Sequence, residues 1–199
     1  FKYRNHAMIL SDGVIGQMME KVVLPEQRPR RTEAEIREQC PWATLGRTPD
    51  RKPNVITSLE LEAAEMEKKN IHFQEKFRII EENEVLYQGC KCEDADYILV
   101  AFGSAARICQ KTVDLARQQG LKVGLIRPIT LWPFPTKVIN QLADRVKGML
   151  TVELNAGQMV EDVRLAVCGK VPVEHYGRMG GMLPTPDEVL EALKTQIIK

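Results

Sequence analysis

The chain has 199 residues, of which 44% are hydrophobic and 28% charged; this composition is typical of a folded domain and excludes a disordered chain. Its 28 basic and 27 acidic residues leave a net charge of +1, so no broad field attracts nucleic acid or an anionic membrane. No apolar run reaches the ~20 residues that would span a bilayer.

Residues 1–24 predict a strand followed by a helix. Residues 7–10 form an apolar run, the turn Ser11-Asp12-Gly13 follows, and residues 14–23 are again mostly apolar. The chain begins with neither an initiator Met nor a basic and apolar leader. We therefore expect the tail of a domain within a longer cytoplasmic protein.

Residues 25–56 predict a linker or an arm that wraps a partner. Dense prolines exclude a long helix and interrupt strand ladders. The prolines of this stretch are Pro25, Pro29, Pro41, Pro49 and Pro53. The basic cluster at residues 28–31 is expected to be a solvated loop.

Residues 57–93 predict a long helix and a connector. Thr57 and Glu60 fit a capping box, with a hydroxyl at the N-cap and a carboxylate at N3. A stripe with alternating steps of four and three residues then predicts a helix that packs along another helix over about 33 Å. The stripe consists of Leu59, Ala63, Met66, Asn70, Phe73, Phe77 and Ile80. It could cover the chain's own domain or a partner subunit.

Residues 94–199 alternate strands and helices. The expected strands are residues 97–101, 122–126, 149–154 and 171–175, and the expected helices open at Gly103, after Pro135, near Met159 and at Thr185. We expect the first three of these helices to end at Gly120, Gly148 and Gly169. This order predicts right-handed crossovers, hence an α/β fold with a mostly parallel sheet and helices on both faces. Pro172 cannot donate to a ladder, so the fourth strand should be an edge or begin at Pro172.

The loops at the carboxyl ends of these strands hold the candidate contact residues, because ligands of open α/β sheets lie there. The candidates for an interface or an anion contact are Gly103, Ser104, Arg127, Trp132, Arg178, Gly180 and Gly181. Gly103 and Ser104 could bind an anion at the helix N-terminus, or Ser104 could simply cap that helix. Trp132 could contact a partner or cover the sheet end, and Gly180-Gly181 would permit close backbone approach beside Arg178.

The sequence predicts no catalytic, cofactor-binding or metal-binding residue in this chain. Glu153 and His175 could serve acid/base chemistry, yet neither has an obvious partner in the sequence. Neither a phosphate loop nor a G-x-G-x-x-G motif is present. The cysteines, which are Cys40, Cys90, Cys92, Cys109 and Cys168, lack the spacing of an iron–sulfur site and are expected to be free thiols. The role of the close pair Cys90 and Cys92 stays open.

Five stretches in order resemble the α subunit of 2-oxoacid:ferredoxin oxidoreductases, in the branch that acts on 2-oxoisovalerate and 2-oxoglutarate. They are residues 11–20 (SDGVIGQMME), 94–107 (DADYILVAFGSAAR), 124–135 (GLIRPITLWPFP), 152–164 (VELNAGQMVEDVR) and 176–188 (YGRMGGMLPTPDE). The resemblance covers residues 5–24 and 90–199.

The resemblance implies an enzyme that decarboxylates a 2-oxoacid on thiamine diphosphate, reduces ferredoxin through iron–sulfur clusters and passes the acyl group to coenzyme A. Residues 94–199 would be a domain similar to the transketolase C-terminal domain, which serves assembly, and residues 1–24 would end a pyrimidine-binding-like domain. Thiamine diphosphate and Mg²⁺ would belong with a β subunit and the clusters with another subunit.

Two other functions fit the same residues. One is a flavodoxin-like module that binds an anion or nucleotide through Gly103, Ser104 and Arg127. The other is the C-terminal domain of a transketolase or an α-keto acid dehydrogenase.

Overall fold

The computed structural model describes residues 1–19, 21–44, 46, 49 and 52–199. The chain divides into two compact units, one made of Phe1–Met18 and Gln74–Lys199, the other of Met19–Phe73. The expected N-terminal helix and the arm each include residues outside this described part.

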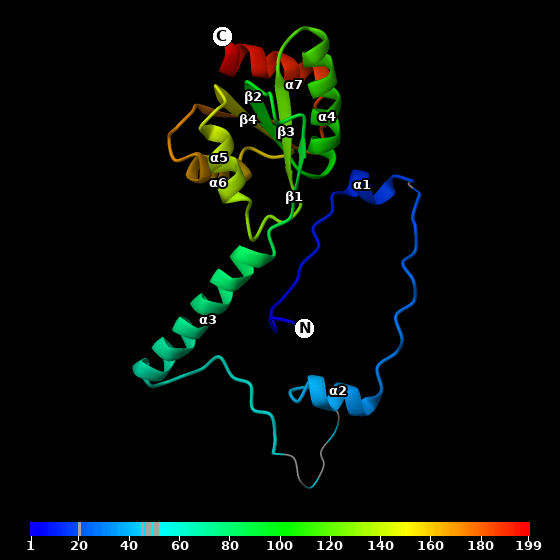
Figure 1. Cartoon of the computed structure of the whole chain (residues 1–199), viewed down its shortest axis with the longest axis vertical. Helices are drawn as coiled ribbons and strands as arrows, with labels where there is room; N and C mark the ends of the chain where they lie inside the picture. Colours follow the sequence, from blue (N-terminus) through cyan, green and yellow to red (C-terminus); the bar gives the residue numbers. More distant parts are fainter. Residues whose placement is uncertain (20, 45, 47–48, 50–51) are drawn as a thin grey trace. The chain divides into compact units, whose positions relative to one another are not determined.

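The larger unit is built on a five-stranded sheet of β1 (Tyr87–Cys90), β2 (Tyr97–Val100), β3 (Val123–Pro128), β4 (Gly148–Glu153) and β5 (Val173–Gly177). Its order is β1-β3-β2-β4-β5. Figure 1 shows the strands between α4 on one side and α5 and α6 on the other. The strands β2 to β5 run parallel, and β1 pairs antiparallel with β3. The prediction of a mostly parallel sheet is confirmed, as is the edge position of β5, which begins directly after Pro172. The sequence did not predict β1, because its exposed residues form no apolar run.

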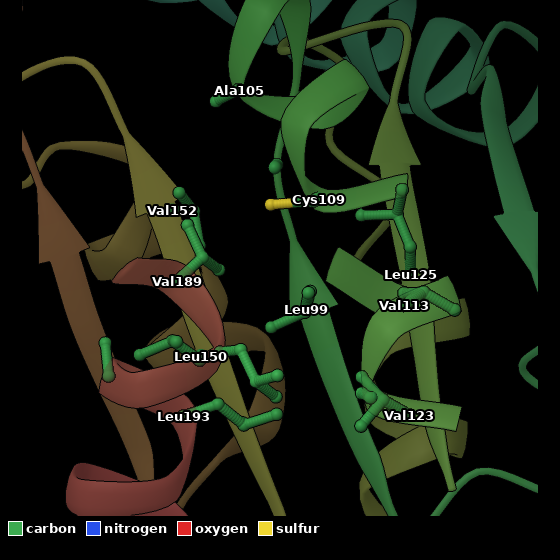
Figure 2. Packing of buried hydrophobic residues seen from close by; sticks show 14 of the residues in the cluster. Leu99, Ala105, Cys109, Val113, Val123, Leu125, Leu150, Val152, Val189 and Leu193 are labelled. Atoms are coloured by element: carbon green, nitrogen blue, oxygen red, sulfur yellow. The ribbon is translucent and has the colours of Figure 1, made fainter. Parts of the chain in front are cut away.

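Helices cover both faces of this sheet, as predicted. They are α4 (Gly103–Gln118), α5 (Thr136–Ala143), α6 (Met159–Val167) and α7 (Pro186–Leu193), with a π-turn at Lys194–Ile198. Successive side chains of a strand point to opposite faces. Leu99 therefore joins a core with α4 and α7 (Figure 2), whereas Ile98 and Val100 join a second core with α5 and α6.

The helix ends agree in part with the sequence. Thr185 caps α7 through a complete capping box with Glu188, as predicted. The predicted end of α5 at Gly148 is wrong, because the helix stops at Ala143 and Gly148 already belongs to β4. The expectation that Ser104 caps α4 is also wrong: Phe102 holds the N-cap position without a side-chain bond, and Ser104 is buried within the first turn.

The N-terminal part of the larger unit differs from the prediction. Residues 7–10 form no strand, because an apolar run becomes a strand only where a neighbour takes its hydrogen bonds, and none of the described strands pairs with it. The helix that follows, α1 (Gly13–Gln17), has only five residues.

The smaller unit contains α2 (Glu33–Gln39), a short helix whose capping box joins Thr32 and Glu35. It also contains the first half of α3 (Ala63–Asn83), which ends in the larger unit. The predicted start of this helix at Thr57 and Glu60 is wrong. The Thr57 hydroxyl accepts a bond from the Leu59 amide at 3.1 Å, and Glu60 pairs with Lys69, so neither group is available as a cap.

The apolar stripe of α3 is only partly buried. Ile80 is 5% exposed, and Phe77 meets Trp132 edge to face with 5.5 Å between ring centroids. The end of the stripe therefore packs on the helix's own unit. Leu59, outside the helix, is 68% exposed, and Phe73 is 43% exposed.

Candidate functional site

The candidate site lies at the carboxyl ends of β2 and β4. The chain passes from β2 to β3 on one side and then crosses to β4 on the other side of β2. Such a switch point opens a crevice where ligands of α/β sheets bind. The N-termini of α4 and α6 face this crevice, since each helix directly follows one of the two strands.

The N-terminus of α4 is occupied by the carboxylate of Asp12. Its oxygens accept hydrogen bonds from the Ser104 hydroxyl at 2.9 and 3.0 Å and from the Ser104 amide at 3.3 Å. The same carboxylate caps α1 by accepting a bond from the Ile15 amide at 2.8 Å. The bond from Ile15, together with those from Ser104, holds the pKa of Asp12 below its ordinary value, although partial burial opposes this. In this structure Ser104 binds the Asp12 carboxylate of the same chain, and binding of an external anion at Gly103 and Ser104 stays a prediction.

The N-terminus of α6 is likewise occupied, by the carboxylate of Glu153 at the end of β4. Glu153 is 2% exposed. It accepts hydrogen bonds from the amides of Gln158 at 3.2 Å, Met159 at 2.9 Å and Val160 at 3.1 Å. A further bond of 3.3 Å comes from the side-chain amide of Asn155. The positive end of a helix dipole stabilises such a buried carboxylate, so Glu153 holds the first turn of α6.

The two acid/base candidates of the sequence lie beside each other. The Nε2 atom of His175 is 3.7 Å from an oxygen of Glu153, and among the described residues it has no hydrogen-bond partner. The ring sits next to Gly177, where an added Cβ would lie 2.6 Å from the His175 Cε1 atom and 2.1 Å from the Asn155 carbonyl oxygen. Only glycine fits at position 177, a close approach that the sequence did not predict.

The remaining candidates bind different neighbours. Arg127 is exposed on β3 and donates to Gln88 of β1 at 3.4 Å. Arg178 forms an ion pair of 2.7 Å with the capping residue Glu188, and its backbone amide donates to the carbonyl of Glu153 at 3.3 Å. Arg127 and Arg178 therefore do not join Ser104 in one anion site.

Gly180 and Gly181 form an exposed turn with positive φ. An added Cβ at either glycine would meet no atom within 4 Å, so within this chain they do not permit a close approach.

Trp132 is 50% exposed and borders a hollow of about 390 Å³. The other lining residues are Asn5, His6, Gln74, Phe77, Arg78 and Glu81. Phe77 and Trp132 give the hollow an aromatic wall, and charged and amide side chains surround it.

Sequence reasoning missed Asp12 as the partner of Ser104. The two residues are 92 positions apart, and no local pattern links them. The role of Glu153 did have a signal, since a carboxylate ended an apolar strand shortly before a helix.

The described residues lack two other kinds of site. They contain no group of three or more His, Cys, Asp or Glu side chains that could hold a metal ion. None of their helices is both long and apolar enough to cross a membrane.

Comparisons with known proteins give a consistent result. Residues 95–189 match the family described as pyruvate:ferredoxin oxidoreductase core domain II. The chain is 42% identical over 193 residues to the ketoisovalerate oxidoreductase subunit VorB of Methanothermobacter marburgensis, covering 97% of this chain and 53% of that protein. It is 28% identical over 218 residues to the 2-oxoglutarate synthase subunit KorA of the same organism, covering 96% and 56%. The chain thus spans about half the length of the curated relatives that it matches.

A solved structure supports the fold. The structure of 2-oxoglutarate:ferredoxin oxidoreductase from Magnetococcus marinus, with 2-oxoglutarate, coenzyme A and succinyl-CoA bound, matches with a TM-score of 0.56 and 20% identity. The match covers 68% of this chain and 24% of that one.

Proposed function

Because the chain belongs to the 2-oxoacid:ferredoxin oxidoreductase family, we propose that it is part of an α subunit and serves assembly, not chemistry. One observation carries this proposal. Both helix N-termini at the switch point, where an α/β sheet would bind a charged ligand, hold carboxylates of the chain itself. Each carboxylate stabilises the start of its helix and takes up N–H donors that a charged ligand would otherwise use.

The described residues at this end of the sheet do not suit thiamine diphosphate. A diphosphate placed at α4 or α6 would meet the negative charge of Asp12 or Glu153, and like charges repel in a partly buried site. In our proposal a β subunit holds thiamine diphosphate and Mg²⁺, other subunits hold the iron–sulfur clusters, and ferredoxin and coenzyme A react with the complete enzyme.

The substrate that we propose is 2-oxoisovalerate. The chain is 42% identical to a relative named for ketoisovalerate and 28% identical to one named for 2-oxoglutarate. We place the enzyme in the cytoplasm, because a reducing compartment keeps thiols free, and none of the described cysteines is in a disulfide.

An acyl-CoA assay tests the assembly role. The 199-residue chain alone and the complex reconstituted with the full-length α chain and its partner subunits are given thiamine diphosphate, Mg²⁺, coenzyme A and a dye as electron acceptor. We expect turnover of 2-oxoisovalerate above that of 2-oxoglutarate by the complex only. Thiamine-dependent turnover by the chain alone would contradict the assembly role, and a preference for 2-oxoglutarate would contradict the substrate.

Variants of the complex test the interface candidates. Trp132→Ala and Arg178→Ala should weaken co-purification of the subunits or lower turnover, because both side chains lie partly exposed outside the core. Lys137→Ala, an exposed change in the first turn of α5, is the control and should change neither. Wild-type assembly and turnover in both variants would remove these residues from the interface.

The alternative of an anion-sensing module has less support. It needs Ser104 and Arg127 to bind one ligand, but Ser104 binds Asp12 and Arg127 binds Gln88. Addition of nucleotides or phosphate should therefore leave the melting temperature unchanged, whereas a ligand at a hundredfold excess over its Kd would stabilise the protein by about 2.7 kcal/mol.

A further inference from the structure

Residues 11–18 contact the first turns of α4, the helix that follows β2. Asp12 makes its bonds to Ser104 in the first turn of α4, and an Arg107 guanidinium nitrogen lies 3.7 Å from the Met18 sulfur. Figure 1 shows α1 beside this end of α4. A negative side chain thus meets the positive end of a helix, and the charges of the two surfaces are complementary.

Apolar burial contributes little to this contact. No residue of α1 is buried, and Val14 and Met18 are 40% and 45% exposed. Both hydrophobic cores of the sheet are built without any residue from 1–18. The polar bonds of Asp12 therefore hold the segment in place.

The helix α1 also depends on these bonds. It has five residues, whereas isolated helices shorter than about 12 residues are marginal in water. One carboxylate caps α1 and binds α4 at once. Loss of the contact with α4 would therefore free a segment that cannot stay helical by itself.

We propose that residues 11–18 form a latch, a tethered acidic segment that docks on the N-terminus of α4 through Asp12 and opens as a unit while the sheet stays folded. The opening breaks the bonds between Asp12 and Ser104 and exposes the α4 N-terminus. This inference does not depend on the proposed enzymatic function, since it rests on contacts within the chain.

Hydrogen exchange measured by mass spectrometry on the full chain tests the latch. The variants are Asp12→Asn, Ser104→Ala and the double variant, with Asp187→Asn, an exposed acid at the start of α7, as the control. Asparagine is a good N-cap residue, so Asp12→Asn keeps the cap of α1 and removes the charge that binds α4.

We expect amides of residues 11–18 to exchange at least tenfold faster in each single variant, with protection of β2, β3 and β4 unchanged within about twofold. The double variant should exchange no faster than Asp12→Asn, because both changes remove the same contact. The control should match the wild type. Unchanged exchange at 11–18 in the single variants would overturn the latch. So would a parallel loss of protection in the strands, because the segment would then unfold only with the sheet.

Discussion

Replacement of Glu153 by Gln should destabilise the larger unit strongly. Glu153 accepts three backbone N–H bonds from the start of α6 and is 2% exposed. The neutral amide turns an NH₂ group toward these donors, so at least one buried N–H loses its partner, at a cost of about 1–3 kcal/mol. Loss of the charge at the helix N-terminus adds about 0.3–1 kcal/mol. The sum, roughly 1–4 kcal/mol, is a substantial part of the about 5–15 kcal/mol that typically separates folded from unfolded domains.

Urea unfolding followed by far-UV circular dichroism measures this effect. With a slope of about 2 kcal/mol per molar urea, the midpoint should fall by roughly 0.6–2 M. Glu161→Gln, an exposed change in the same turn of α6, is the matched control and should cost about 0.5 kcal/mol or less. If Glu153→Gln unfolds at the same midpoint as the control, the carboxylate of Glu153 does not hold the N-terminus of α6 and the argument from occupied helix ends fails.

Three further predictions test the packing of the larger unit. Gly177→Ala should lower Tm by several degrees, because the new Cβ would lie 2.1 Å from a backbone oxygen of the loop after β4. An unchanged Tm would show that this loop moves aside at little cost in stability. Cys168 is exposed and should react first with a thiol reagent, whereas burial raises the pKa of the Cys109 thiol, which should react only on unfolding; mass mapping of labelled peptides would expose the opposite order. Phe77→Ala should shift the fluorescence of Trp132 to longer wavelength by removing its edge-to-face neighbour, and an unshifted spectrum would deny that contact.

Features with a local physical cause could be predicted from the sequence. Strands buried on both faces appear as continuous apolar runs, as at residues 97–100. The start of α7 is marked by Thr185, Pro186 and Glu188, which are typical of a helix N-terminus. Gly120 and Gly169 follow α4 and α6 with positive φ, as expected for residues just past a helix end.

Features with a distant cause could not be predicted. The predicted start of α3 was wrong: Glu60 forms an ion pair with Lys69, nine residues away, and does not act as a cap. The function of Ser104 depended on Asp12, and β1 exists only because β3 offers an edge to its short and exposed residues. For the candidate site, the sequence singled out Ser104, but the carboxylate that Ser104 binds, that of Asp12, was visible only in three dimensions.

The division of the chain into two units indicates where the chain can be shortened, extended or cut. Residues 19–73 leave the larger unit after Met18 and return to it at Gln74, so they are an insertion between two segments of one folded body. The cost of closing such a loop grows slowly, by about 0.6 kcal/mol for each doubling of its length. This insertion, residues 19–73, should therefore tolerate shortening or extension with little effect on the sheet. A single cut within this insertion should leave the sheet folded, because the two hydrophobic cores contain no residue of 1–73.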